Sequence, residues 1–219
     1  MNESEKLSSE LRDIKQMMER SSRFISLSGL SGISAGIFAL IGAWLSADVI
    51  ERNRSAVHHL KRTIENADSI LYGDFIHSRL FQIAIITFIA ALVSAFLFTY
   101  RRSKKTNVPI WGTTAKRLTI NVIVPMITGG FFLFALIKNG VYGFVAPGCL
   151  IFYGLGVLNA SKYTLPETRY LGYGEILLGI INLFFLGQGL YFWAAGFGVL
   201  HIFYGVFMWW KYEMNNERN

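Results

Sequence analysis

The chain has 219 residues, of which 53% are hydrophobic and only 16% are charged, and its formal net charge is +7. Soluble domains carry about 25% charged residues, so this composition and a mean hydropathy of +0.39 exclude an ordinary soluble domain and predict an all-α polytopic membrane protein. The excess of Lys and Arg is typical of cytoplasmic membrane loops, and no nucleic-acid-binding motif accompanies it.

The first predicted element is a cytoplasmic amphipathic helix over residues 1–23. Asn2 followed by Glu5 matches a capping box, and charged residues surround the apolar positions. The apolar residues recur at a spacing of four, three and four: Leu7, Leu11, Ile14 and Met18. Such a helix lies on lipid headgroups or under the bundle. The alternative is a handle for dimerisation or for docking a cytoplasmic protein partner.

Six segments are long and apolar enough to cross a bilayer, which takes about 20 residues per helix. We predict spans near residues 24–49, 80–100, 118–138, 141–160, 169–187 and 189–210. They pair into three antiparallel hairpins over residues 24–100, 118–160 and 169–210.

The connections between the spans differ in length. The extracytoplasmic loop 51–79 is long and polar, with a short helix predicted at 55–70, and the cytoplasmic loop 101–117 is basic. The turns at 138–140 and 187–189 are short, and their Gly and Asn residues are expected to supply left-handed backbone.

The distribution of the 21 Lys and Arg residues predicts the orientation. With the N-terminus inside, most of them fall in the cytoplasmic segments 1–23, 101–117 and 211–219 and in the linker between the second and third hairpins. The positive-inside rule then places both termini in the cytoplasm. Loop 51–79 runs against this rule, because it holds most of the remaining basic residues.

An internal repeat organises the second half of the chain. One copy covers residues 139–154 and the other 188–205; they close on Ile151-Phe152-Tyr153-Gly154 and on Ile202-Phe203-Tyr204-Gly205. Upstream, Gly130-Phe131 aligns with Gly179-Ile180, and Gly36-Ile37 occupies the same place in the first span. A two-helix unit returns the chain to its starting side, so successive copies are parallel. The inverted repeats of many alternating-access transporters are therefore not indicated.

Small residues form stripes along the first span. Small side chains let helix backbones approach closely, which favours association inside lipid. The stripe serves either a homo-oligomer interface or packing within the monomer, and the second interpretation is the simpler. The helix-packing candidates are Gly29, Gly32, Gly36, Ala39 and Ala43.

A cluster of polar residues is predicted inside the third hairpin. Glu175 lies about two turns into the fifth span, and an intramembrane carboxylate is a functional candidate because it is costly to bury. His201 of the sixth span is expected at a similar depth, where it pairs with Glu175. Asn182 shares the helix face of Glu175, and Tyr204 follows His201 by three residues. A structural clamp is the alternative role, since Gly32 and Met126 replace Glu175 in the other repeat units.

No pattern of catalytic or cofactor-binding residues occurs in the sequence. It holds no Ser-His-Asp arrangement, phosphate loop or zinc-protease helix, so no enzyme class and no cofactor are predicted. His58, His59 and His77 match no recognised spacing of metal ligands. Cys149 lies in an apolar run and is expected to be an inert buried thiol.

The stretch Gly172–Glu213 resembles small, uncharacterised inner-membrane proteins of the Bacteroidota. The residues that carry the resemblance are Gly196 to Gly205 and Lys211-Tyr212-Glu213, together with Met18 to Phe24 leading into Gly29-Leu30-Ser31-Gly32. The glycine-rich hairpins are also distantly similar to the HdeD family of acid-resistance membrane proteins. These resemblances imply an inner-membrane location and stacked helix pairs, and no specific activity.

Two functions are consistent with the sequence. The first is a non-enzymatic membrane protein of stress, sensing or scaffold type, which works through oligomerisation or through partners of its cytoplasmic segments. The second is a small transporter or channel with a polar path around Glu175 and His201. A dry, packed Glu175 would favour the first, and a water-filled cavity reaching it would favour the second.

Overall fold

The computed structural model describes residues 28–61, 78–106 and 110–214, with the side chains of 53–61 outside the description. Every regular element among these residues is helical. A final helix, residues 189–214, combines α-helical and π-helical segments. The long helices are α2 (Gly29–Lys61), α3 (Arg79–Thr106), α4 (Thr113–Lys138), α5 (Val145–Ala160) and α6 (Thr168–Phe184). The final helix consists of α7 (Gly189–Trp193), η5 (Ala194–Leu200), α8 (His201–Trp209) and η6 (Trp210–Met214), and the short 3₁₀ turns are η3 (Tyr142–Phe144) and η4 (Leu186–Gln188).

Five of the helical segments are long and apolar enough to cross a membrane: Gly29–Arg52, Arg79–Thr106, Thr113–Lys138, Tyr142–Ala160 and Leu186–Met214. The other predicted span corresponds to α6, whose 17 residues extend about 25 Å at 1.5 Å per residue. Large apolar side chains such as Phe131, Phe184 and Phe203 lie on the surface. A soluble monomer rarely exposes such extensive apolar surface, so the structure fits a multi-pass membrane protein.

The first helix is longer than predicted. We expected it to end near residue 49 and a separate helix to cover 55–70, whereas α2 continues without interruption to Lys61. The sequence contains no Gly or Pro between Ala43 and Lys61 to end the helix, and Asp48 forms an ion pair with Arg52 one turn later, at 2.9 Å. The predicted helix over 1–23 and residues 62–77 of loop 51–79 lie outside the described residues.

The two short turns differ in their backbone. Gly140 adopts the left-handed conformation, with φ of 74°, as expected. Asn139 instead has φ of −92° and ends α4 through its side chain, which donates to the carbonyl of Ala135 at 2.7 Å. The prediction of left-handed backbone was wrong for the second turn, where η4 forms a 3₁₀ turn and Gly189 has φ of −50°. Helical backbone therefore leads directly into the final helix.

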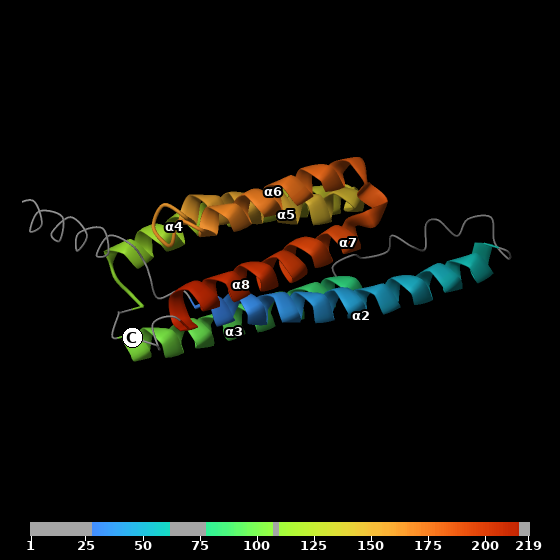
Figure 1. Ribbon diagram of the computed structural model, residues 1–219. Helices are drawn as coiled ribbons and strands as arrows, with labels where there is room; N and C mark the ends of the chain where they lie inside the picture. Colours follow the sequence, from blue (N-terminus) through green and yellow to red (C-terminus); the bar gives the residue numbers. More distant parts are fainter. Residues whose placement is uncertain (1–27, 62–77, 107–109, 215–219) are drawn as a thin grey trace, which may run out of the picture.

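The helices form two groups that the final helix joins (Figure 1). α2 and α3 pack together in one group, and α4, α5 and α6 lie side by side in the other. The final helix packs most extensively along α2 and also contacts α5 and α6. α6 packs far more closely on α5 than on the final helix, because the final helix leans toward α2.

Two helix crossings use the same glycine pattern. Gly29 and Gly36 of α2 meet the final helix, where a Cβ on Gly36 would lie 2.6 Å from the carbonyl oxygen of Gly198. Gly172 and Gly179 of α6 meet α5, where a Cβ on Gly179 would lie 3.0 Å from the carbonyl oxygen of Pro147. The backbones therefore touch directly at both crossings, as small residues permit inside lipid.

The small residues of α2 serve packing within the chain. Gly29, Gly32 and Gly36 all face the backbone of the final helix, and Ala39 and Ala43 are buried. Their stripe is thus covered by the protein itself.

Candidate functional site

Glu175 and His201 meet in the interior between α6 and the final helix. Glu175 has no exposed surface and His201 is 6% exposed. Nδ1 of His201 lies 3.2 Å from Oε1 of Glu175. Both carboxylate oxygens lack a hydrogen-bond partner among the described residues. The imidazole is therefore the polar group that balances the buried carboxyl, because an unpaired charge is very costly in such surroundings.

The π-helical segment η5 shapes the surroundings of His201. Nδ1 of His201 also lies 3.1 Å from the carbonyl oxygen of Gly196, five residues earlier. A Cβ on Gly196 would lie 2.6 Å from Oε2 of Glu175 and 2.5 Å from Leu150. Gly196 thus provides both an acceptor for His201 and the space for Glu175, which fits the frequent occurrence of π segments at functional sites.

A third polar side chain, Tyr153 of α5, completes the arrangement. Its hydroxyl lies 2.6 Å from Nε2 of His201. Glu175, His201 and Tyr153 therefore form a continuous polar chain, which we call the buried relay. It joins α6, the final helix and α5. Because Nδ1 needs its proton to donate to Gly196, Nε2 accepts from Tyr153 in neutral His201 and donates to Tyr153 in the protonated form.

The other two predicted members of the cluster lie elsewhere. Asn182 is fully buried, but its Nδ2 donates to the carbonyl of Phe185 at 3.0 Å and ends α6. Seven residues separate it from Glu175, which is about 10 Å along a helix. The hydroxyl of Tyr204 lies 2.8 Å from Oγ1 of Thr168, at the start of α6. Neither residue is part of the buried relay.

The sequence prediction missed Tyr153, although a signal was present. Tyr153 and Tyr204 occupy the same place in the two copies of the repeat, within Phe-Tyr-Gly in each. The choice of Tyr204 followed from its nearness to His201 in sequence. The residue that contacts the imidazole is its counterpart in the preceding copy, because α5 packs beside the final helix.

A cavity of about 300 Å³ adjoins the buried relay in the seam between the two helix groups, and we call it the seam cavity. Tyr153 and His201 line it together with small residues of α2, α3 and α4 and with Phe88, Phe152, Trp193 and Phe197. Glu175 is not among its lining residues. A second cavity of about 290 Å³ shares Thr87 and Trp193 with the first and continues along the seam.

The seam cavity lies where the repeat would place a third close crossing. Gly130 of α4 occupies the position of Gly36 and Gly179 in the repeat, yet nothing lies within 4 Å of the place where its Cβ would be. Ile123 replaces the first glycine of the pair, and α3 contains no glycine to receive the crossing. α3 packs on α2 and α4 packs on α5. The seam between α3 and α4 therefore stays open.

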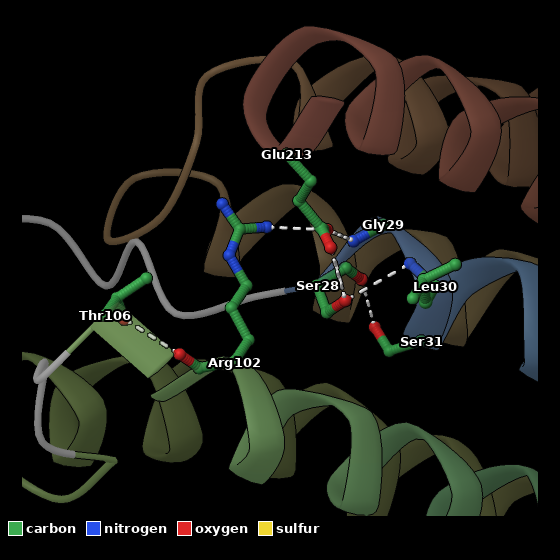
Figure 2. Close-up of polar contacts among 7 residues, drawn as sticks. All are labelled: Ser28, Gly29, Leu30, Ser31, Arg102, Thr106 and Glu213. Carbon is green, nitrogen blue, oxygen red and sulfur yellow. Dashed lines mark hydrogen bonds and ion pairs between the residues drawn. The ribbon is translucent and has the colours of Figure 1, made fainter. Parts of the chain in front are cut away.

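A second polar cluster holds the beginning of α2 (Figure 2). Glu213 of η6 accepts hydrogen bonds from Gly29 N at 2.6 Å, Ser28 Oγ at 3.1 Å and Arg102 Nη1 at 2.9 Å. These four residues, the terminal clasp, join α2, α3 and the final helix. An acidic side chain at a helix N-terminus also interacts favourably with the helix dipole.

The neighbouring residues of η6 hold the other helix group. Lys211 donates to Oε1 of Glu167, and the hydroxyl of Tyr212 donates to the same oxygen at 2.9 Å. Burial opposes ionisation of Glu167, but these hydrogen bonds favour the carboxylate and hold the pKa of Glu167 below its usual value. Residues 211–213 thus tie the final helix to both groups.

The chemistry available at the buried relay is ion pairing between Glu175 and His201 and hydrogen bonding between His201 and Tyr153. In the ranges 28–61, 78–106 and 110–214, no group of three His, Cys, Asp or Glu side chains is placed to hold a metal ion. His77 and the side chains of His58 and His59 lie outside the description. Cys149 is partly buried and lines the seam cavity.

Comparison with known proteins gives no match. No family model matches the chain, and neither a curated protein nor a solved structure is similar to it. The resemblances drawn from the sequence therefore stay predictions.

Proposed function

We propose that the chain is a non-enzymatic, multi-pass protein of the bacterial inner membrane, with six spans and both termini in the cytoplasm. In this proposal α6 also crosses the membrane, as the fifth span along the chain, and so completes three hairpins. The protein acts as a sensor or scaffold, in which the final helix couples two helix groups. The N-terminal segment and the basic loop offer binding sites for cytoplasmic partners, and the exposed apolar faces contact lipid or a second copy.

One observation carries this proposal: Glu175 is completely buried, paired with His201 and packed against Gly196. A carboxylate that binds a transported ion needs access to water. The neighbouring seam cavity is lined mainly by apolar side chains and meets the buried relay at Tyr153 and His201. This arrangement favours a polar link that holds helices together and senses what fills the cavity.

The alternative is a small transporter or channel. The observation in its favour is the succession of two cavities along the seam, which share Thr87 and Trp193. Their apolar lining weakens it, because ions need polar groups to replace their hydration shell.

Ion flux into proteoliposomes separates the two functions. We expect purified protein in sealed vesicles to pass protons and K⁺ at the rate of protein-free vesicles under an imposed gradient. A flux above that rate that is lost in Glu175→Gln would overturn the proposal and establish the transporter. Glu213→Gln is the matched control, because it removes a carboxylate at the terminal clasp, about 18 Å along the final helix from His201.

A further inference from the structure

We propose that the seam cavity is a binding site for a lipid-soluble quinone, whose ring oxygen hydrogen-bonds to Tyr153, with His201 holding the Tyr153 hydroxyl in place. This inference rests on the proposed sensing function and names its ligand class. It concerns binding alone.

The seam cavity is reached between α3 and α4. Phe88 and Leu92 of α3 line the cavity although they are 49% and 54% exposed. Gly130 of α4 lines it from the other side and is also exposed. These residues flank the open seam between α3 and α4 and lie in the middle of two membrane-length helices. The cavity is therefore reached from the hydrocarbon core, where quinones dissolve.

The shape and lining favour a flat ring. Trp193 and Phe197 have ring centroids 4.6 Å apart, and Tyr153 lies 5.2 Å from Phe197 and 5.3 Å from His201. These four aromatic side chains all line the cavity. Aromatic rings pack well on one another in offset or edge arrangements. A volume of about 300 Å³ is at the lower end for small-molecule pockets, which suits a ring with its tail left in the bilayer.

The charge of the lining favours an uncharged ligand. The described residues that line the cavity include no Lys, Arg, Asp or Glu. A fatty acid anion or a phospholipid headgroup would lose its hydration there without a cationic partner, which is costly. A neutral ring with one or two oxygen atoms needs only hydrogen bonds.

The pair of Tyr153 and His201 can recognise both redox forms of such a ring. When Nε2 donates to Tyr153, the hydroxyl proton is left to donate to a quinone carbonyl. When the hydroxyl donates to Nε2, its oxygen accepts from a quinol hydroxyl. Glu175 beside Nδ1 balances the charge of His201 when the imidazole is protonated, and it acts as a positioning residue because it does not line the cavity.

The absence of the third helix crossing explains why this site is open. At the two other crossings, backbone fills the space beside the equivalent glycines, Gly36 and Gly179. At Gly130 the same space is empty in the protein. A ligand in the seam cavity occupies the position of a missing helix contact, so its binding would join α3 to α4.

The test uses decylubiquinone with the purified full chain in quinone-free phosphatidylcholine nanodiscs. Trp193 is the reporter, because quinones quench nearby indole fluorescence. We expect a saturable component of quenching that disappears in Trp193→Phe. Gly130→Leu should abolish it by filling the cavity, and Tyr153→Phe should weaken it about tenfold, the effect of one lost hydrogen bond of ordinary strength. Gly187→Leu and Tyr170→Phe are the matched controls, and we expect wild-type binding in both.

Two comparison ligands test the ligand class. Decylbenzene has a ring and tail without oxygen, and dodecanoate has a charge; both should bind more than tenfold more weakly than decylubiquinone. Equal binding of decylbenzene, with no effect of Tyr153→Phe, would overturn the quinone and leave a site for apolar tails. Quenching that never saturates would also overturn the quinone proposal. So would a dimer that Gly130→Leu disrupts, because it would show that a second copy of the chain closes the seam. The ion-flux experiment tests the proposed function separately, so a failure of that function is distinguished from a failure of quinone binding.

Discussion

The His201→Leu substitution tests whether the buried relay holds the protein together. It removes the nitrogen 3.2 Å from Oε1 of Glu175 and leaves a fully buried carboxyl without a polar partner. Removing one member of a buried ion pair costs about 3–5 kcal/mol, whereas a side-chain hydrogen bond in a membrane protein is worth about 0.6 kcal/mol on average. We therefore expect His201→Leu to lower the free energy of unfolding by about 3 kcal/mol.

The second half of this experiment removes the carboxyl as well. Replacing both members of a buried pair by apolar residues of similar size is often close to neutral. We expect Glu175→Met, added to His201→Leu, to recover about 2 kcal/mol of the loss. Unfolding by SDS in bicelles, followed by circular dichroism, measures His201→Leu, Glu175→Met and the double variant. The control pair is Thr168→Val with Tyr204→Phe, a neutral hydrogen bond of 2.8 Å, for which we expect a coupling of about 0.6 kcal/mol. Losses that simply add for Glu175 and His201 would refute the reasoning.

Three further predictions use the same unfolding assay. Gly36→Leu should cost about 3 kcal/mol or more, because its Cβ meets backbone at a close crossing, while Gly130→Leu should cost nothing; equal losses would contradict the repeat argument. Glu213→Gln should cost about 2 kcal/mol, since it weakens charge-assisted hydrogen bonds of the terminal clasp; an unchanged stability would count against the clasp. Folding lowers the pKa of Glu167, so the contribution of this carboxylate to stability is present above its unfolded pKa of about 4.3 and is lost as the pH falls through the folded pKa. Lys211→Met should make the stability less sensitive to acid. A pH profile identical to that of the wild type would exclude the ion pair with Lys211 as the source of this sensitivity.

The positions of the helices along the chain were easier to predict from the sequence than the pairs of helices that pack together. Long apolar stretches bounded by basic clusters located the membrane-length helices, because hydropathy alone decides which segments can lie in lipid. The extension of α2 to Lys61 was missed because the polar residues after residue 49 were expected to end the helix. No Gly or Pro occurs there to do so. The close packing of α2 on the final helix joins residues far apart in the sequence, such as Gly29 and Trp209, and hydropathy carries no information about such pairs.

The candidate site was predictable to the extent that depth in a membrane can be counted along a helix. Their equal depth on consecutive spans predicted that Glu175 and His201 lie close together, and the two side chains are in contact. The repeat marked Tyr153 and Tyr204 as equivalent candidates, and only the packing of α5 shows that Tyr153 is the one that contacts His201. The seam cavity could not be predicted from the sequence, since it arises from a contact that α3 and α4 do not make. The functional role of these residues stays a prediction.

Spin-label accessibility at position 130 tests the central claim, that the seam beside the buried relay opens to lipid and not to water. The label is attached to Gly130→Cys in a Cys149→Ser background and reconstituted in vesicles, with Gly112→Cys as the control outside the longest apolar stretch. The account predicts that relaxation at position 130 responds strongly to oxygen, which dissolves in lipid, and weakly to a water-soluble nickel chelate. A strong response to the nickel chelate would reveal an aqueous path at the seam and contradict the account.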